Sequence, residues 1–354
     1  LEKNFGNTIN EIKKDGFDIF SEIKISMQKD SKKSTALAIS SGIQSISKVL
    51  EKVNPDYFIV YADRFEGLAA VISSTQMNIP TIHIEGGDIT EGGALDDSVR
   101  HSMTKLSHFH FTTNEEASKR IINMGEEKWR VKTVGFPAID MIKLNNYASK
   151  EELEKKYKIN SKQPILLFTQ HSVTTEFNKS KEQIKHSINA IKYLAKKNFR
   201  IFVTYPNNDV GGVRIINEIN KLKNLKNIDV VKSLGRYNYH GILALAKDKN
   251  FKVVCIGNSS SGIKETPVFN CPTINIGSRQ NSRLRGTNVI DVDYDKDEII
   301  KSVNKCINNK KFIASCLKTI NPYGGGNSGQ KIANFIVNIK KSRMTILRKK
   351  FIDR

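Results

Sequence analysis

Residues 81–108, TIHIEGGDITEGGALDDSVRHSMTKLSH, are the stretch that sets the expected fold of this chain. The stretch begins as a short apolar strand, breaks at Gly86-Gly87 and again at Gly92-Gly93, and enters a helical pattern at Asp96. A strand, a glycine-rich turn and a helix make up the unit of an α/β fold whose ligand binds at the strand's carboxyl end. Glu85 stands where the strand ends, so we treat it as a candidate functional acid. The alternative is a solvated loop in which Asp96 or Asp97 caps the helix. For Asp97, we expect this solvated, capping role.

The same alternation of apolar strands and helical segments runs along the whole chain. Continuous apolar runs such as YFIVY are typical of strands buried on both faces, and strands alternating with helices predict parallel, doubly wound sheets. In the first half, strands are expected at residues 57–61, 81–84, 108–112 and 131–134, with a short one at 18–20. In the second half, they are expected at 165–169, 201–204, 228–231, 252–256, 272–276 and 289–292.

A polar segment rich in Lys and Glu at residues 145–162 marks the expected connection between two domains. We predict an N-terminal Rossmann-like domain over residues 1–148 and a C-terminal Rossmann-like nucleotide-binding domain over 149–330. A C-terminal helix and basic tail would follow over 331–354. We expect the tail to be solvated and frayed, rather than to contact an anionic surface. A cleft between two such halves is a common ligand site.

The opening of the chain differs from that of a complete Rossmann-like domain. No strand with its own phosphate-binding turn precedes the first helical segments. We therefore expect the first domain to lack its amino-terminal β-α unit.

Composition narrows the class of protein. The 354 residues, 38% of them hydrophobic, suit two α/β domains, and no apolar run approaches the length of a membrane span. The four cysteines have no metal-binding spacing, so we expect small buried residues in a reducing cytoplasm. The net charge of +21 raises nucleic-acid binding as an alternative, but the lysines are spread along helical surfaces rather than gathered in one block.

Polar residues gather where four of the expected strands end. Asp63-Arg64 and Glu85 follow strands of the first half, and QHSVTTE (170–176) follows the first strand of the second half. GNSSSGIKE (257–265) follows a later strand, and its small residues enter an expected helix at 263–269. Backbone N–H groups and hydroxyls there could hold a phosphate on the helix's positive end, the alternative being ordinary Ser capping.

Together these segments resemble the hydrolysing UDP-N-acetylglucosamine 2-epimerases of sialic acid and related nonulosonic acid pathways. The resemblance covers nearly the whole chain. It is carried by ADRFEGLAA (62–70), HIEGGD (83–88), LDDSVRHSMTKLSH (95–108), TQHSVTTE (169–176), YPNNDVGG (205–212), GNSSSGIKE (257–265) and IGSRQNSRLRG (276–286). It implies a glycosyltransferase-B-type fold, a UDP-sugar substrate, a homo-oligomer (dimer or tetramer), and no metal or redox cofactor. Departures are Ala62 in the usual place of Gly, Ser172 in that of Pro, and the missing GTR-type turn.

The resemblance also implies roles for individual residues. Asp63, Glu85 and Asp96 would supply catalytic carboxylates, with Asp63 as the base at carbon 2 and Glu85 in the hydration half. His171 would serve a phosphate or the leaving group. The expected substrate-binding residues are Arg64, Asn207, Ser259, Ser260, Glu265 and Arg279.

Each role has a structural alternative. Arg64 could pair with Glu66 or Asp63, Glu265 could be a helix acid, and a lone His is often structural. A working base would need burial or an acidic neighbour to raise its pKa.

Three functional alternatives stay open from the sequence. The same fold could serve a non-hydrolysing epimerase or a glycosyltransferase. A non-enzymatic, basic nucleic-acid-binding protein is the alternative of another class. Within the hydrolysing reaction, the substrate could be UDP-N-acetylglucosamine or a 2,4-diacetamido sugar nucleotide.

Overall fold

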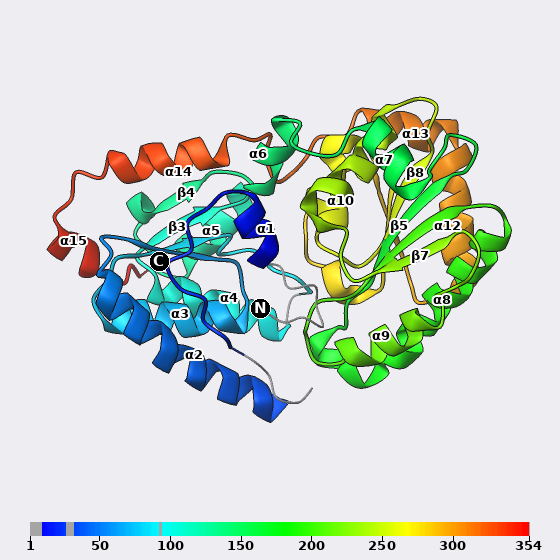
Figure 1. Ribbon diagram of the computed structural model, residues 1–354. Helices are drawn as coiled ribbons and strands as arrows, with labels where there is room; N and C mark the ends of the chain where they lie inside the picture. The colour runs from blue at the N-terminus through cyan, green and yellow to red at the C-terminus, as the bar shows by residue number, and fades with distance from the viewer. Residues whose placement is uncertain (1–8, 26–31, 92–93, 354) are drawn as a thin grey trace. The chain divides into compact units, whose positions relative to one another are not determined.

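The computed structural model describes residues 9–25, 32–91 and 94–353. These residues form two compact units (Figure 1). The four-stranded unit comprises Asp18–Asp140 together with the chain from Tyr323 onward. The six-stranded unit comprises Met141–Pro322 and the described residues up to Phe17. The Gly92-Gly93 pair of the sequence analysis lies outside the described residues.

The division between the units differs from the boundaries predicted at 148/149 and 330/331. It falls within helix α6 (Ala138–Lys143), because Ile142 and Ala148 already belong to the hydrophobic core of the six-stranded unit. The segment from Tyr323 onward groups with the four-stranded unit. The chain therefore leaves the four-stranded unit, builds most of the other, and then returns.

The four-stranded unit is a parallel sheet covered on both faces (Figure 1). Its strands are β1 (Phe58–Tyr61), β2 (Thr81–Ile84), β3 (Phe109–Thr112) and β4 (Val131–Thr133), which pair in sequence order. Its helices are α2 (Lys32–Val53), α3 (Phe65–Gln76), α4 (Leu95–Leu106), α5 (Glu115–Asn123), α14 (Ser328–Val337) and α15 (Arg343–Leu347). Ile82, Phe109 and Phe111 pack against Ile332 of α14 and Ile346 of α15, so the end of the chain closes one face of this sheet.

Residues 18–20, expected as a short strand, form no strand. The side chain of Phe20 is 71% exposed. Without burial on a sheet face, the apolar pair Ile19-Phe20 gains too little to offset the entropy of ordering an extended segment.

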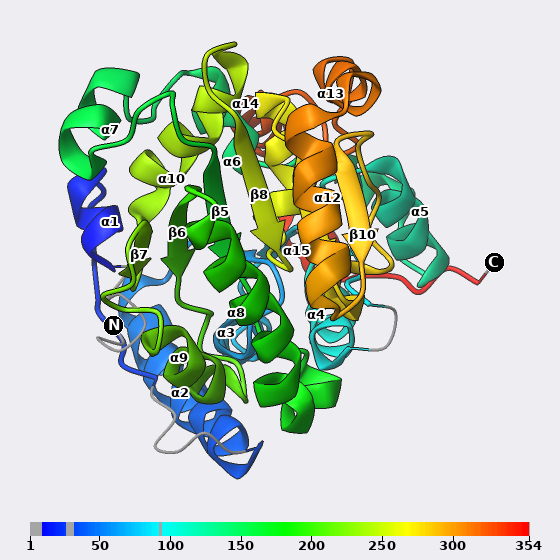
Figure 2. The same cartoon turned by 90° about the vertical axis from the view of Figure 1, so that its right-hand side faces the viewer.

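The six-stranded unit has the strand order of a doubly wound nucleotide-binding fold (Figure 2). Its strands are β5 (Ile165–Thr169), β6 (Arg200–Thr204), β7 (Ile228–Val231), β8 (Val253–Gly257), β9 (Thr273–Ile276) and β10 (Val289–Val292). They are all parallel and are ordered β10-β9-β8-β5-β6-β7. The direction of winding reverses between β5 and β8, and ligands of such sheets bind outside the strand ends at that point. The prediction of two Rossmann-like α/β halves is confirmed.

Helices cover both faces of the second sheet. The helices of this unit are α1 (Ile9–Lys14), α7 (Lys150–Tyr157), α8 (Ser180–Lys196), α9 (Gly212–Asn220), α10 (Gly235–Ala244), α11 (Ser261–Lys264), α12 (Lys296–Asn308) and α13 (Lys310–Leu317). On β5, Leu166 and Phe168 belong to one buried cluster and Ile165 and Leu167 to the opposite one, as expected of a strand buried on both faces. No helix in the described parts of the chain is long and apolar enough to cross a membrane.

The C-terminal tail is bound to the four-stranded unit, so the expectation of a frayed, solvated end is wrong for its described residues. Arg130, which is fully buried, donates hydrogen bonds to the carbonyl oxygens of Ile346 (2.8 Å) and Thr345 (3.1 Å). The backbone N–H of Ile352 donates to the carbonyl of Gly125 (3.0 Å). The Arg130 bonds satisfy carbonyls of α15, and together with the Ile352 bond they fix a segment whose composition alone suggested solvation.

A buried carboxylate receives part of the tail's positive charge. Glu126 has no exposed side-chain surface, and its oxygens lie 2.6 Å from Nζ of Lys105, 2.9 Å from Nζ of Lys349 and 3.2 Å from Nε2 of His110. Burial acts to raise the pKa of Glu126. The hydrogen bond from His110 and the charges of Lys349 and Lys105 outweigh it and lower that pKa to about 2. Glu126 is therefore ionised at neutral pH and depends on its cations.

We predict that Lys349→Met destabilises the four-stranded unit by about 1.5–3 kcal/mol, because it removes a charged hydrogen bond from a buried carboxylate that keeps Lys105 and His110. The only tryptophan of the chain, Trp129, lies in this unit. Its fluorescence in a urea titration therefore reports on the unfolding of the four-stranded unit. Lys350→Met, at the exposed neighbouring position, is the matched control and should change stability by less than about 0.5 kcal/mol. Equal midpoints for the two variants would contradict this role of Lys349.

Candidate active site

Two acidic residues follow neighbouring strands of the four-stranded sheet. β1 and β2 pair in parallel with Tyr61 opposite Ile84, so Asp63 and Glu85 come after adjacent strand ends, as the sequence predicted. Ala62 and Glu85 have φ values of 64° and 70°, in the left-handed region that favours glycine. The usual Gly in the place of Ala62 thus has a physical reason. Both acids belong to tight turns at which the chain leaves a strand.

His83 holds this turn in place. Its Nε2 lies 2.7 Å from the carbonyl oxygen of Ala62 and must donate to it, so Nδ1 is the acceptor for the hydroxyl of Thr104 (3.2 Å). A Cβ at Gly86 would lie 2.8 Å from Nδ1 of His83, which explains the glycine there. Burial lowers the pKa of His83 to about 3. A neutral imidazole thus supports the backbone just before Asp63.

A buried guanidinium lies among the acids, and the sequence analysis did not assign it a role. Arg100 on α4 is 1% exposed and forms an ion pair with Asp63. Its Nη1 donates to Oδ1 of Asp97 (2.7 Å) and to the carbonyl of Asp88 (2.9 Å), and its Nη2 donates to Oγ1 of Thr90 (3.2 Å). One side chain therefore connects the ends of two strands with the helix that follows them. The spacing of Asp97 and Arg100, one helical turn apart, was the signal for part of this cluster.

The electrostatics of the cluster differ from the sequence-based expectation. We expected neighbouring acids to raise the pKa of a catalytic carboxylate, but a permanent positive charge lies between them. Burial acts to lower the pKa of Arg100, yet Asp63, Asp88 and Glu85 raise it above its usual value. The guanidinium is therefore charged at any pH at which the protein folds, and it favours the ionised form of the carboxylate that it contacts.

The other sequence-predicted residues of this unit have varied surroundings. Asp97 does not cap α4. It is buried and accepts the backbone N–H of Thr90 (2.7 Å), so the prediction of a solvated capping residue is wrong. Asp96 lies in the first turn of α4 and is partly buried. Arg64 forms the salt bridge with Glu66 that was the alternative to phosphate binding (3.2 Å), although its side chain is still 36% exposed.

In the six-stranded unit, His171 follows β5 at the point where the winding reverses. The backbone N–H of Asn207 donates to Nδ1 of His171 (3.0 Å), so a neutral ring carries its proton on Nε2. That tautomer can donate a hydrogen bond to a phosphate oxygen. The structure thus brings together two predicted residues from the loops after β5 and β6.

Asn258 is a further site residue that the sequence analysis did not single out. Its Oδ1 accepts the backbone N–H of His171 (2.6 Å), and its Nδ2 donates to the carbonyl of His171 (3.0 Å). Nη1 of Arg279 donates to the carbonyl of Asn258 (3.2 Å). Gly257 has φ 127°, and a Cβ there would lie 1.9 Å from the carbonyl oxygen of Thr169. The close approach of the β8 turn to β5 therefore requires glycine and lets Asn258 orient His171.

The small-residue loop after β8 differs in one respect from expectation. Only one α-helical turn, α11, follows Ser259 and Ser260, with a 3-10 turn after it. A helix macrodipole large enough to hold a phosphate is therefore not available at this loop. Side-chain hydroxyls and the N–H groups of the loop would have to bind the phosphate instead. Glu265 accepts a hydrogen bond from Nε2 of His240 (2.8 Å), with 14% of its side chain exposed.

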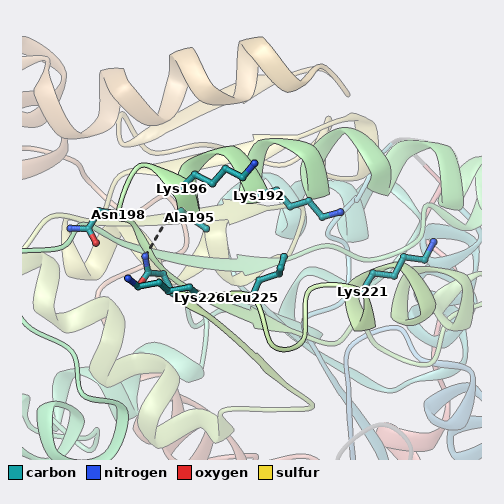
Figure 3. A pocket seen from close by; sticks show the side chains of 8 residues that line it. Lys192, Ala195, Lys196, Asn198, Lys221, Leu225 and Lys226 are labelled. Carbon is teal, nitrogen blue, oxygen red and sulfur yellow. Dashed lines mark hydrogen bonds between the residues drawn. The ribbon is translucent and has the colours of Figure 1, made fainter.

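Two other kinds of site receive little support. In the part of the chain that the structure describes, no three His, Cys, Asp or Glu side chains are grouped so as to hold a metal ion. A pocket of about 600 Å³ lies between α8 and the turn after α9 (Figure 3), near Asn198 and Asn227, which precede β6 and β7. Its eight lining residues include Lys192, Lys196, Lys221 and Lys226 but no acid. It offers no carboxylate base and lies away from the strand ends that carry the candidate residues.

Comparison with known proteins decides the family. The sequence pattern of the family described as UDP-N-acetylglucosamine 2-epimerase matches residues 1–337. The chain belongs to this family. It is 34% identical over 339 residues to a Legionella pneumophila protein named UDP-N,N'-diacetylbacillosamine 2-epimerase (hydrolyzing), covering 96% of this chain and 86% of the relative. A Campylobacter jejuni GDP/UDP-N,N'-diacetylbacillosamine 2-epimerase (hydrolyzing) is 35% identical over 341 residues, covering 91% and 86%.

Solved structures share the fold of this epimerase family. A Neisseria meningitidis UDP-GlcNAc 2-epimerase bound to UDP-GlcNAc superposes with a TM-score of 0.73 at 21% identity, over 88% of this chain and 83% of that one. The matched family pattern and the two relatives confirm the recognition of the family from its motifs. With it, the prediction of an enzyme of the 2-epimerase family is confirmed, in place of the non-enzymatic alternative.

We predict that His83 makes stability fall with acidity. Unfolded His binds a proton near pH 6.5, whereas folded His83 does so near pH 3. Its contribution is therefore present above pH 6.5 and is lost as the pH falls towards 3, by about 1.4 kcal/mol per pH unit. His83→Gln keeps a donor for the Ala62 carbonyl and does not titrate. The difference in free energy of unfolding between wild type and this variant, measured by Trp129 fluorescence, should shrink at that rate between pH 6.5 and 5. A constant difference would show that His83 is not buried in its neutral form.

Proposed function

We propose that the chain hydrolyses a UDP-linked 2,4-diacetamido sugar with inversion at carbon 2, releasing UDP and the free 2-epimeric sugar. The carrying observation is the identity of 34% and 35%, over nine-tenths or more of this chain, to two proteins named as hydrolysing diacetylbacillosamine 2-epimerases. UDP-N-acetylglucosamine is the competing substrate, because the matched Neisseria meningitidis and archaeal proteins carry that name.

The proposed chemistry has two halves. A carboxylate takes the proton from carbon 2 while the bond from carbon 1 to the diphosphate oxygen breaks, which leaves a double bond between these carbons and releases UDP. Water then adds its oxygen to carbon 1, and a proton returns to carbon 2 on the opposite face. One water molecule is consumed, and no electron acceptor is needed.

The six-stranded unit supplies groups suited to the leaving nucleotide. We assign His171, with its proton on Nε2, to a phosphate oxygen, and the hydroxyls of Ser259 and Ser260 to the same diphosphate. Glu265, oriented by His240, would accept the ribose hydroxyls. Asn207 and Arg279 would act partly through His171, since one bonds its ring and the other bonds Asn258.

The four-stranded unit supplies the carboxylates. We assign Asp63 to proton removal at carbon 2, because the buried charge of Arg100 keeps it ionised while 22% of its side chain stays exposed to a substrate. Glu85 and Asp96 are assigned to the hydration half, and Arg64 to a phosphate oxygen. Arg64 would have to exchange its bond with Glu66 for this.

Two further features belong to this proposal. A cytoplasmic location is supported by four cysteines that are all free and buried. A homo-oligomer stays a prediction from the family resemblance.

Product analysis tests the proposed function and its substrate. We expect UDP and a free 2-epimeric sugar from the UDP-2,4-diacetamido sugar. The kcat/KM for this substrate should be at least about tenfold above that for UDP-N-acetylglucosamine, because an active site adapted to the diacetamido sugar would also bind its second acetamido group. Mass spectrometry in ¹⁸O-water should place the label on the sugar. An epimerised product still linked to UDP would identify a non-hydrolysing enzyme instead.

We predict that Asp63→Asn and Glu85→Gln each lower UDP release by roughly 10²–10⁴-fold, because each removes basicity and keeps shape. UDP affinity, measured by calorimetry, should be unchanged in both. Asp63→Asn should also abolish hydrogen exchange at carbon 2 in deuterated water, whereas Glu85→Gln should let the unsaturated intermediate accumulate on the enzyme together with the UDP formed in the same step. The matched control is Glu116→Gln, which changes an exposed acid on α5 paired with Lys119. Near-normal UDP release by either site variant would return that residue to a structural role.

A further inference from the structure

The ion pair between Arg100 and Asp63 is asymmetric in its exposure. The Arg100 side chain is 1% exposed, whereas that of Asp63 is 22% exposed. Burying an ion pair carries a desolvation penalty that can exceed its Coulombic gain, so fold stability alone does not explain why the Arg100 charge is enclosed. Here the cation is enclosed and the carboxylate stays open on one side. The buried partner can therefore control a group that another molecule can approach.

The bonds of Arg100 explain how it could exert such control. Nη2 contacts Asp63 after β1, and Nη1 contacts both Asp97 of α4 and the carbonyl of Asp88 after β2. A planar guanidinium fixes the angles between its partners in a way that an ammonium ion cannot. Asp63 is thereby fixed in orientation relative to the loop that begins with Glu85.

We propose that Arg100 is the positioning residue of the proton-transfer step, which holds Asp63 ionised and oriented toward carbon 2 of the substrate. This inference rests on the proposed function. Arg100 transfers no proton itself. The proton moves from carbon 2 to Asp63, the electron pair of that C–H bond enters the new double bond, and UDP leaves with the electrons of the bond at carbon 1.

The charged and titratable groups around Arg100 determine how its removal would affect the protonation of Asp63. The groups that interact with it or with its partners are the carboxylates of Asp63, Glu85, Asp88 and Asp97, the imidazoles of His83 and His101, and the guanidinium of Arg120. Both imidazoles have lowered pKa values, chiefly through burial, and are neutral at pH 7. Arg100 therefore faces four carboxylates. Removing it would leave them to repel one another, and the protonated form of Asp63 would be favoured.

Two substitutions in the full-length chain separate the charge of Arg100 from its geometry. Arg100→Gln removes the charge, so the acid limb of the kcat/KM profile should move to higher pH by about one unit or more. Arg100→Lys keeps a charge but cannot make the same set of bonds. It should keep the acid limb within about half a unit of wild type while kcat falls by up to about a hundredfold, as expected of a misplaced base. KM and UDP affinity should change little in both variants, because Arg100 bonds Asp63, Asp88, Thr90 and Asp97, none of which is assigned to the nucleotide.

Arg130→Gln is the matched control. It removes a guanidinium that is equally buried in the same unit but bonds Glu127 and the tail carbonyls. It should lower the unfolding midpoint and leave the pH profile unchanged. If Arg100→Gln also changes only the midpoint, Arg100 is merely structural and the proposal is overturned.

An NMR measurement tests the proposal without relying on turnover. Carboxyl ¹³C titration of aspartate-labelled protein, with Asp63 assigned through Asp63→Asn, should show Asp63 titrating at lower pH in wild type than in Arg100→Gln. If Arg100→Gln does not fold, Arg100→Lys takes its place, and Asp63 should then titrate near its wild-type pH. Identical Asp63 titration in wild type and Arg100→Gln would overturn the proposal, as would a large shift in Arg100→Lys. Absence of turnover by wild type with either sugar nucleotide would count against the proposed function instead.

Discussion

Parallel pairing of every strand within each sheet is the constraint on which the candidate site depends. In a parallel sheet all carboxyl ends lie along one edge, so loops far apart in the sequence meet there. In the four-stranded unit this places Asp63 and the turn at Glu85 side by side after β1 and β2. In the six-stranded unit it places His171 next to Asn258, because β5 and β8 pair along their whole length. The residues to which we assign chemical roles are brought together by this pairing and belong to several loops.

Two buried charged side chains of the four-stranded unit, one acidic and one basic, are each enclosed by groups of opposite charge. Glu126 is enclosed by Lys105, His110 and Lys349 and serves to attach the tail. Arg100 is enclosed by acids, one of which remains partly exposed. Both charges would be costly alone, and both are satisfied by groups from separate elements. A buried charge with partners from separate elements attaches the tail in one case, and in the other it contacts the carboxylate to which we assign proton removal.

The sequence predicted the strands well because their signal is local. The run at 165–169 is apolar throughout and matches β5, since a strand buried on both faces has no polar side to interrupt the pattern. The pair Ile19-Phe20 carried a weaker version of that signal and formed no strand, because no sheet face covers it. The tail was misjudged for the opposite reason. Its lysines indicated solvation, whereas the partners of Lys349 lie more than two hundred residues earlier in the chain. Arg100 and Asn258 were missed likewise, because a lone polar residue gives no hint of a distant partner.

The return of the chain to the four-stranded unit has a consequence for synthesis on the ribosome. Residues 18–140 leave the ribosome long before the tail of the chain. The tail carries Ile332 and Ile346, which cover one face of the four-stranded sheet, and Lys349, which pairs with Glu126. The intervening segment, Met141–Pro322, contains every strand of the other sheet and can become compact while translation continues. The six-stranded unit can therefore become compact before the four-stranded unit is complete. A nascent chain arrested before the tail would expose apolar sheet surface and would leave Glu126 with one cation fewer. Exposed apolar surface is a feature that chaperones and proteases recognise in incomplete proteins.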